Sequence, residues 1–378
     1  MSYVNFPTSK LSQLEFTTRR EIVRTNHAGS YTSTTLNGCN TRKYHGLLVC
    51  PIAAFGGSKH VLLSALDESI KVKGTIIPLA TRRYADGYLD PKGHRFFSKF
   101  DFERIPRFTF HTGDIVLTKE RLLVEKEQQL LVKYVLEEAT GPVSMIFRPF
   151  LAFRNIHELS KSNMYVHTAV EEEQNGISIR MYEGYPRLYM QFSQWCEFQP
   201  SPDWHYNVEY IVEKQRGYDA LEDLYTPGTF EVKLKKGDSL VFSASTFAAS
   251  PPAFKQRFSR EVSKRINRDS FTGCLKNAAN QFIQYKDDVA VDIIAGFPWF
   301  NSISRQTFIA LPGLRIAQSE RRLALEVLST YLPHLKNGFF PDSIADNYPV
   351  YHSPDASLWF IWAMQQFKKQ GSRFKEFG

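Results

Sequence analysis

The sequence is poor in cysteine, and its few cysteines are not spaced for a common task. The 378 residues include four cysteines, Cys39, Cys50, Cys196 and Cys274. No two of them form a C-x-x-C pair, and no histidine stands at metal-ligand spacing from any of them. This spacing argues against both a disulfide framework and a zinc site.

The sequence also lacks a membrane-spanning or secretory segment. No apolar run reaches the roughly 18 residues that a membrane-spanning helix needs. The N-terminal residues MSYVNFPTSKLSQLEF do not show the basic region followed by an apolar region that marks a signal peptide. We therefore expect no membrane partner and a location in the reducing cytoplasm.

Charge of one sign is not concentrated in any segment of the chain. The formal net charge of +8 is of the kind that permits binding to nucleic acid. The basic residues occur only as scattered doublets, such as Arg19-Arg20 and Lys235-Lys236, and acidic runs such as Glu171–Glu173 interleave with them. We interpret the charge as a solvated surface and expect no nucleic-acid partner.

Length and aromatic content are the positive features of the composition. A chain of 378 residues is too long for one ordinary core and suits two domains, or one large domain with part of another. Aromatic residues make up 14% of the chain. They indicate either large β-sheet cores or ring faces that stack on sugars, and composition leaves both readings open.

From about Ile22 to Phe247 the sequence has the pattern of antiparallel β-structure. Short runs alternate between apolar and polar residues and are separated by glycine-containing turns, as in β-hairpins. The predicted hairpins join Ser69–Val72 to Ile76-Ile77, Ile177–Tyr182 to Leu188–Phe192, and Phe230–Leu234 to Leu240–Phe242. Many strands at such spacing predict a large antiparallel sandwich.

The pattern becomes helical after Ser250-Pro251-Pro252. We therefore expect a β-domain over residues 1–250, a linker over 251–268 and the first helices of an α-domain over 269–378. Three helices are predicted. The first begins at Asp269 or Ser270, with Phe271, Leu275, Ala278, Ala279, Phe282 and Ile283 on one face; the second begins near Ser319, with Leu323, Ala324, Val327, Leu328 and Tyr331 inward; the third begins at Ser353-Pro354.

The third predicted helix is apolar on every side. Its run from Ala356 to Met364 has no polar face beyond Ser357. A helix of this kind is expected to be buried all round, inside a layer of several helices. If that layer is left open, we expect the sides of the helix to be exposed and to form an association surface.

Two polar clusters in the β-region are candidates for a sugar site. Arg42, Tyr44 and His45 directly precede an apolar strand, so they could reach a sugar from a strand end or satisfy a local turn. The segment from Trp204 to Asp223 combines aromatic rings with Glu and Arg. It suits a sugar-lined groove and suits equally an interdomain loop held by ion pairs.

A third cluster lies between two of the predicted helices. Trp299 and Phe300 offer a stacking platform, and Arg305 and Gln306 offer ligands for hydroxyl groups. The same residues also suit an aromatic core with an arginine that caps a helix.

Asp355 is the strongest candidate for a catalytic acid. It lies in the first turn of the third helix, where nearby apolar residues such as Leu358 would raise its pKa as a glycosidase acid requires. The helix N-terminus acts in the opposite direction, because it favours the anion. Glycoside hydrolysis normally needs a second carboxylate, and the sequence offers Asp288, Asp292, Asp342, Asp346 and Glu376.

Taken in order, several of these stretches resemble the bacterial and archaeal glycogen-debranching family, whose catalytic domain is of the amylo-α-1,6-glucosidase type. The matching stretches are Asn40–Val49, Val61–Ile70, Gly93–Arg95, Leu151–Leu159, Trp204–Asp223, Phe297–Leu314 and Asp355–Phe360. The resemblance implies a β-supersandwich followed by an (α/α)6 toroid, inverting hydrolysis of α-1,6-linked glucose stubs, an α-glucan substrate and no metal or cofactor.

Site residues follow from the same resemblance. Asp355 matches the family's proposed general acid, and Trp299, Phe300 and Arg305 match its sugar-pocket motif. The remaining candidates for substrate binding are Gln306, His352, Tyr44 and His45.

The chain departs from the family in two respects. Where the family motif reads approximately WGRDT, this sequence has Ile303-Ser304-Arg305-Gln306-Thr307, so an acid becomes a neutral amide. Loss of a charged hydrogen bond costs roughly 1.5–3 kcal/mol. The residues after Arg268 also suffice for only part of a twelve-helix toroid, and the family's base lies in its later part.

The resulting expectation is an α-1,6-glucosidase with an incomplete toroid that a C-terminal segment would complement. The alternative expectation, based on Gln306 and the missing base, is a non-catalytic α-glucan-binding or scaffold protein on the same fold.

Overall fold

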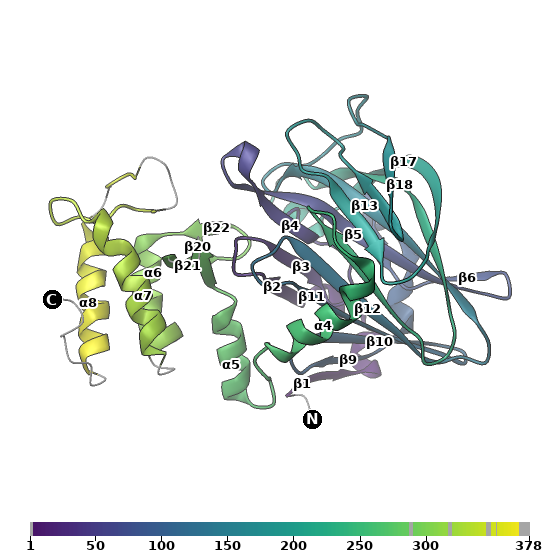
Figure 1. Ribbon diagram of the computed structural model, residues 1–378, viewed down its shortest axis with the longest axis horizontal. Helices are drawn as coiled ribbons and strands as arrows, with labels where there is room; N and C mark the ends of the chain where they lie inside the picture. Colours follow the sequence, from purple (N-terminus) through teal and green to yellow (C-terminus); the bar gives the residue numbers. More distant parts are fainter. Residues whose placement is uncertain (1–2, 287–289, 317–319, 345–348, 353, 370–378) are drawn as a thin grey trace. The chain divides into compact units, whose positions relative to one another are not determined.

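The computed structural model describes residues 3–286, 290–316, 320–344, 349–352 and 354–369, and the chain forms two compact units (Figure 1). Unit 1 is Met1–Ser270 and unit 2 is Phe271–Gly378. Within the described ranges, no helix is both long and apolar enough to span a membrane.

Unit 1 is rich in antiparallel sheet. Among the described residues, one sheet has nine strands in the order β1 (Val4–Pro7), β9 (Phe97–Phe102), β10 (Pro106–Thr112), β11 (Ile115–Leu123), β12 (Gln129–Glu138), β19 (Ser239–Ser245), β16 (Leu188–Phe192), β15 (Gly176–Ile179) and β14 (Val170–Glu173).

A second sheet of unit 1, again counted over described residues, has eight strands, of which β6 pairs only with β5. Its members are β17 (Glu197–Glu209), β18 (Leu221–Leu234), β13 (Val143–Asn155), β5 (Ser58–Val72), β4 (Gly46–Ile52), β3 (Tyr31–Thr35), β2 (Glu21–Thr25) and β6 (Thr75–Pro78). Strands β7 (Thr81–Arg83) and β8 (Leu89–Lys92) form a small ribbon. The short helices of unit 1 are α1 (Thr8–Leu11), α2 (Leu14–Thr18), α3 (Ile211–Gln215) and α4 (Phe254–Ser263), with turns η1 (Ala53–Phe55), η2 (Ala85–Gly87), η3 (Gly93–Phe96) and η4 (Pro251–Ala253).

The two large sheets pack face to face through one apolar core. The ring of Phe147 on β13 lies 5.2 Å from that of Tyr134 on β12 and 5.0 Å from that of Phe192 on β16, measured between centroids. All three side chains are completely buried. Because the apolar residues alternate along these strands, one face of each sheet supplies the core. The predicted antiparallel sandwich is confirmed at this level.

Two of the three predicted strand pairs are confirmed. Ser69 to Val72 of β5 pairs with Thr75 to Pro78 of β6, and β15 pairs with β16.

The third predicted hairpin is wrong. Strand β18 pairs with β13 and β17, whereas β19 pairs with β12 and β16, so the turn at Gly237 carries the chain from one sheet to the other. Gly237 does take the left-handed conformation expected of a turn glycine, with φ of 86°. Alternation and a glycine turn are shared by hairpins and by sheet-crossing connections, so local pattern could not separate the two.

The segment 251–268, expected to be a linker, holds η4 and helix α4 and belongs to unit 1. Phe254 and Phe258 of α4 are buried against Leu122 of β11 and Val241 of β19. Helix α4 therefore covers part of the nine-stranded sheet. The sequence signal for a linker was the proline pair, which here opens a helical turn.

Unit 2 has a small sheet and four α-helices within its described residues. Its strands are β20 (Ile283–Lys286), β21 (Ala290–Gly296) and β22 (Phe300–Ser302); its helices are α5 (Phe271–Asn280), α6 (Ser304–Leu311), α7 (Arg321–Tyr331) and α8 (Asp355–Lys369), with turns η5 (Pro312–Ile316) and η6 (Leu332–His334).

The second predicted helix is confirmed as α7. Ala324, Val327, Leu328 and Tyr331 are all completely buried, as the period of the sequence requires. Its predicted start, Ser319, lies outside the described residues.

The first and third predicted helices exist, but their burial differs from the prediction. On α5, Phe271 and Leu275 are exposed, and Ile283 begins strand β20 instead of continuing the helix. On α8, Ala356, Ala363 and Phe367 are buried, whereas Leu358, Ile361 and Trp362 are exposed. The prediction that α8 is buried on every side is therefore wrong for this structure, in which only one side of the helix meets the core of unit 2.

Candidate functional site

Asp355 and Arg305, predicted as acid and sugar ligand, lie together in unit 2. Asp355 is in the first turn of α8 and Arg305 is in the first turn of α6, and these two helices pack against each other. The Arg305 Nε atom is 3.0 Å from the Asp355 Oδ2 atom. The side chains are 56% and 33% exposed, so the pair is accessible to a solute.

His352 is held by a second aspartate beside the same helices. Its Nδ1 atom lies 2.6 Å from the Oδ2 atom of Asp342. The Ser304 amide donates to the backbone carbonyl of Asp342 over 2.8 Å. This bond ties the Asp342 segment to the N-terminus of α6, directly next to Arg305.

The aromatic candidates precede α6 in the chain. Trp299 is half-buried at the turn after β21, and Phe300, at the start of β22, is 56% exposed. Gln306 is exposed on α6, next to Arg305. In contrast, Ser304 and Thr307 of the divergent motif are completely buried, and the Ser304 hydroxyl donates to the carbonyl of Pro341. Of the residues that differ from the family motif, Ser304 is therefore buried and Gln306 is exposed.

Asp292, one of the candidate second carboxylates, is buried and surrounded by hydrogen-bond donors. It is 8% exposed and accepts hydrogen bonds of 2.7 Å from the Tyr331 hydroxyl and from the Ile293 amide. The Thr307 hydroxyl lies 3.4 Å away. Burial raises the pKa of Asp292, although these donors oppose the shift. Asp292 is thus hydrogen-bonded and buried within unit 2, unlike the accessible Asp355. Asp288, Asp346 and Glu376 lie outside the described residues.

The predicted residues of the β-region lie in unit 1. His45 is completely buried, and its Nδ1 atom accepts from the Thr41 amide over 3.1 Å. Burial lowers the pKa of His45, so its ring is neutral at neutral pH. Such a ring offers no surface to a sugar. It supports the turn that carries Arg42 and Tyr44.

Glu21 anchors the same turn from strand β2. Its Oε1 atom accepts from the Nε atom of Arg42 over 2.7 Å. Its Oε2 atom lies 3.7 Å from the Nε2 atom of His45. Burial alone would raise the pKa of Glu21, but the hydrogen bonds and charges of His45 and Arg42 outweigh it and lower the pKa from 4.5 to about 2. At neutral pH, where the His45 ring is uncharged, Arg42 is the cation that holds this carboxylate.

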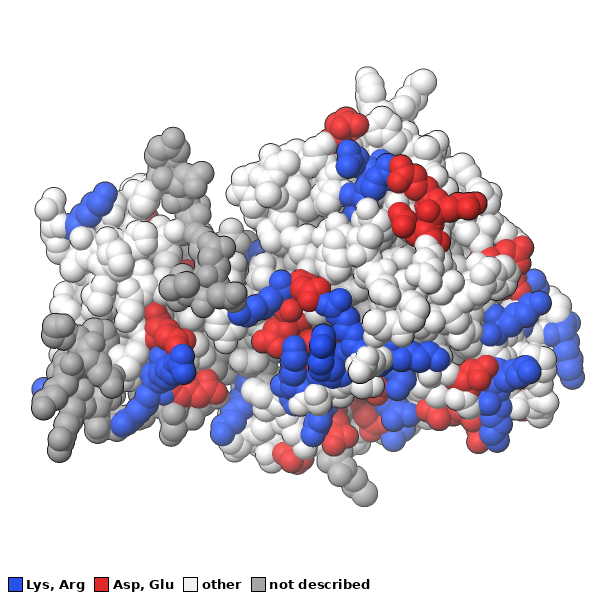
Figure 2. All heavy atoms as spheres, viewed as in Figure 1, with Lys and Arg blue, Asp and Glu red and all other residues white. Residues whose placement is uncertain are grey.

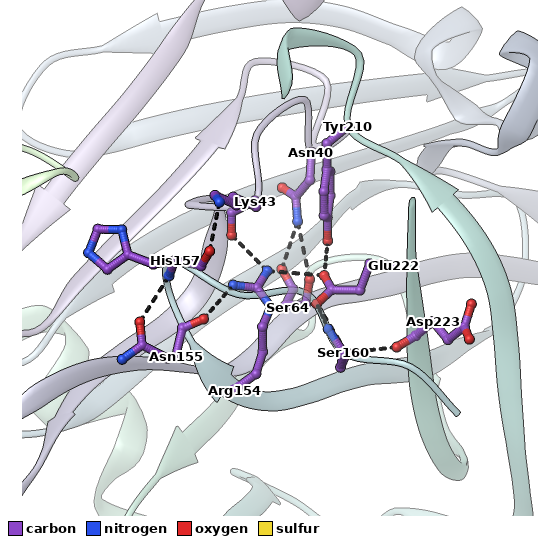
Figure 3. A network of polar contacts seen from close by, with 10 residues as sticks. All are labelled: Asn40, Lys43, Ser64, Arg154, Asn155, His157, Ser160, Tyr210, Glu222 and Asp223. Atoms are coloured by element: carbon purple, nitrogen blue, oxygen red, sulfur yellow. Dashed lines mark hydrogen bonds and ion pairs between the residues drawn. The ribbon is translucent and has the colours of Figure 1, made fainter. Parts of the chain in front are cut away.

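A buried ion pair lies beneath this turn (Figure 3). The guanidinium of Arg154 contacts both oxygens of Glu222, one of them over 3.0 Å, and these residues are 5% and 0% exposed. Glu222 also accepts from the Tyr210 hydroxyl and, over 2.9 Å, from the Ser160 amide. Burial opposes the charge of Arg154, but Glu222 outweighs it and raises the pKa of the guanidinium. The segment Trp204–Asp223 consists mainly of the end of β17, helix α3 and the start of β18 within unit 1, and ion pairs hold it.

Each of the two units matches the model of a known protein family. Residues 20–241 match the model described as glycogen debranching enzyme N terminal. Residues 277–377 match the model described as amylo-alpha-1,6-glucosidase. The chain belongs to the glycogen debranching enzyme family. The predicted resemblance is thus confirmed.

Solved structures resemble this debranching-family chain only distantly. A bacterial glucoamylase complexed with acarbose is 9% identical with a TM-score of 0.45, and the match covers 98% of this chain and 56% of that one. An inverting mannosidase from Bacteroides thetaiotaomicron is 9% identical with a TM-score of 0.32, over 91% of this chain and 49% of that one. Heparan sulfate lyase from Pedobacter heparinus is 12% identical with a TM-score of 0.28, over 57% and 33%. The chain thus spans about half the length of the glucoamylase. No curated protein matches it.

Sequence reasoning missed several polar residues of this debranching-family chain. Arg154 and Glu222 lie in stretches that carried the resemblance, but neither was singled out as half of a buried pair. A signal was present, because Arg154 directly follows the apolar run Phe150–Phe153 of a central strand. Asp342 as the partner of His352 had no local signal, since a ten-residue separation has no fixed geometry outside a helix.

Proposed function

We propose that this chain is the front portion of a debranching α-1,6-glucosidase, which hydrolyses α-1,6-linked glucose stubs of glycogen or limit dextrin with inversion. The match of residues 277–377 to amylo-alpha-1,6-glucosidase, a range that includes Asp355, is the observation that carries the proposal. The accessible Asp355–Arg305 pair supports it, because it presents an acid and a hydroxyl ligand on neighbouring helices.

The fold within this proposal is a β-supersandwich followed by an incomplete (α/α)6 toroid. Exposed apolar side chains on α5 and α8 support it, since soluble proteins seldom leave such groups uncovered together. A complementing C-terminal segment would cover them and supply the general base. Residues 1–250, 251–268 and 269–378 remain our proposed divisions by function, with α4 packed on the first.

Asp355 is the proposed general acid, with Trp299, Phe300, Arg305, Gln306 and His352 around the sugar. In this structure the Asp355 carboxylate faces the Arg305 guanidinium over 3.0 Å, whereas a general acid must face the glycosidic oxygen that it protonates. The proposal therefore requires the Arg305–Asp355 pair to open when substrate enters, with Arg305 turning to sugar hydroxyls. Tyr44 and His45 belong to unit 1. In this proposal His45 acts only by supporting the turn that carries Tyr44.

The proposed substrate is an α-glucan, with no metal or cofactor. The surface charge supports a neutral ligand over nucleic acid. On the face shown in Figure 2, basic and acidic side chains interleave and form no continuous basic stripe.

The test is glucose release from a branched limit dextrin by the chain alone and together with the product of any downstream reading frame. We expect activity with the second piece, and β-glucose as the first anomer seen by NMR. Asp355→Asn should reduce the rate by about 10²–10⁴-fold, the usual contribution of a general acid. Glu326→Gln is the matched control, because Glu326 forms a similar exposed pair with Arg322 at 2.9 Å on α7. Inactivity of every combination, or equal rates for the two variants, would refute the proposal.

A second candidate function is a non-catalytic α-glucan-binding or scaffold protein. The exposed Gln306, which replaces the acid of the family motif, and the ion pairing of Asp355 favour it. Calorimetry with maltooligosaccharides separates the two candidates. Binding without turnover in the complemented protein supports the scaffold, and absence of binding excludes it.

A further inference from the structure

Three segments that are far apart in the sequence meet at one place in unit 1 (Figure 3). They are the stretches Asn40–Val49, Leu151–Leu159 and Trp204–Asp223. The Lys43 ammonium donates to the backbone carbonyl of His157 over 2.6 Å, and the Arg154 guanidinium donates to that of Lys43 over 2.7 Å. Because Arg154 also holds Glu222, a single buried ion pair fixes all three segments.

An open groove of about 830 Å³ lies over this junction. Lys43, His157, Glu158, Lys161, Tyr218 and Asp219 are among the residues that line it. A volume of this order is typical of sites that hold a ligand of several rings. All of the lining residues belong to unit 1, so the groove needs nothing from unit 2.

The residues beneath the groove are buried and hydrogen-bonded, whereas, among the described residues, two carboxylates at its rim are not. Beneath it, Glu222 and Asp223 are buried, and the Asp223 carboxylate accepts from the Ser162 amide over 3.0 Å. At the rim, within the described part of the chain, the carboxylates of Glu158 and Asp219 form no ion pair or hydrogen bond. Two acceptor groups are thus available to a ligand.

The charges that line the groove do not favour an ion of either sign. Lys43 and Lys161 balance Glu158 and Asp219, so the formal sum over these four is zero. Tyr218 is 58% exposed, and the guanidinium carbon of Arg216 lies 5.0 Å from its ring centroid, which restrains the ring. An aromatic face beside carboxylates suits a molecule with both C–H faces and hydroxyl groups.

We propose that this groove is a binding site for a linear stretch of α-glucan on the N-terminal unit. Tyr218 stacks on a glucose ring, and Glu158 and Asp219 accept hydrogen bonds from its hydroxyl groups. The choice of an α-glucan rests on the proposed function, whereas the preference for a neutral polyhydroxyl ligand rests on the groove alone.

The test is a calorimetric titration of the full chain with maltoheptaose, with Asp355→Asn present in every protein to prevent turnover. Tyr218→Ala should weaken binding about tenfold, since an aromatic contact contributes roughly that factor. Tyr88→Ala is the matched control, because Tyr88 is 61% exposed, has the Lys92 ammonium 5.9 Å from its ring centroid, and does not line the groove. Glu158→Gln with Asp219→Asn should weaken binding as well.

The outcomes separate this proposal from the proposed function. Equal affinity of the Tyr218→Ala and Tyr88→Ala proteins, or no maltoheptaose binding at all, overturns the groove whatever the hydrolysis assay gives. Tighter binding of a single-stranded oligonucleotide than of maltoheptaose overturns it too. Loss of maltoheptaose binding in Tyr218→Ala alone upholds the groove, even where the complemented protein releases no glucose.

Discussion

The two units differ in where large apolar side chains are exposed: the most exposed ones of unit 1, Met164, Tyr165 and Trp195, lie outside its helices and strands. Unit 1 buries its large aromatic residues between two sheets and gives its buried charges partners, as Arg154 and Glu222 illustrate. Unit 2 leaves large apolar side chains exposed on two helices, with exposed fractions between 37% and 66%. These are Phe271, Leu275, Leu358, Ile361 and Trp362. Unit 1 therefore holds one large aromatic core, whereas unit 2 presents apolar side chains along two of its helices.

The two units also differ in the kind of group that holds a buried carboxylate. In unit 1 the buried carboxylate of Glu222 faces a guanidinium, so each charge lowers the cost of burying the other. In unit 2 the buried carboxylate of Asp292 is held by neutral donors, chiefly the Tyr331 hydroxyl. The four predictions below test this contrast, in order of decreasing expected effect on stability.

The largest effect is expected from Arg154→Met in unit 1. The change leaves Glu222 buried without its cation, which typically costs about 3–5 kcal/mol. Urea unfolding should show a loss of this size in the transition of unit 1. Lys236→Ala is the control, because its pair with Glu138 is more than half exposed on both sides, and it should cost less than about 1 kcal/mol. Similar losses in the two variants would show that the buried pair is not what holds unit 1.

The sequence predicted those parts of both units in which burial follows the period of the chain. Helix α7 is the clearest case, because four inward residues at helical spacing are all buried. The sandwich was predictable for the same reason.

Long-range placement was not predictable in this way. The turn at Gly237 has the local chemistry of a hairpin, yet it connects two sheets, and only the pairing of β18 with β13 and of β19 with β12 decides the matter. Asp355 and Arg305 were singled out from their residue chemistry and again from the family resemblance, but their proximity depends on the packing of α8 on α6. The apolar pattern of α8 alone predicted burial on every side, and exposed sides were expected only from the number of residues available for the toroid.

Tyr331→Phe should have the next largest effect, in unit 2. It removes a donor from the buried Asp292 carboxylate at a site that water cannot reach, and an unsatisfied group of this kind costs about 1–3 kcal/mol. Amide hydrogen exchange should become faster in β21 and α7 and stay unchanged in β12 and β13. Tyr351→Phe is the matched control, because its hydroxyl donates to the His334 carbonyl over 3.0 Å from a half-buried position that water can reach. If exchange in unit 1 accelerates equally, the units do not behave as independent.

The pH dependence of stability should have opposite signs at Glu21 and Asp292. The pKa of Glu21 falls from 4.5 to about 2 on folding, so its contribution is present above pH 4.5 and is lost as the pH falls toward 2. The pKa of Asp292 rises from 3.8 on folding, so its contribution is present below pH 3.8 and is lost as the pH rises through the higher folded value. Acidification from neutral pH should therefore first favour unit 2 and then disfavour unit 1. Hydrogen exchange of Glu21→Gln and Asp292→Asn across this range checks each sign, and an unchanged profile in either variant contradicts its assignment.

The smallest effect on stability is expected from lysine on the exposed side of α8. Leu358 and Ile361 are 66% and 54% exposed, so Leu358→Lys with Ile361→Lys should change the unfolding free energy of unit 2 by no more than about 0.5 kcal/mol per site. The same substitutions should abolish concentration-dependent association in sedimentation, and should block complementation by a C-terminal segment, because a charge must then be buried at the contact. Ser329→Lys adds the same charge at an exposed polar position of α7, away from this side of α8, and should leave both properties intact. A loss of several kcal/mol in the double variant would mean that the α8 side chains already support the core of unit 2, and the contrast between the units would then lie in their charges alone.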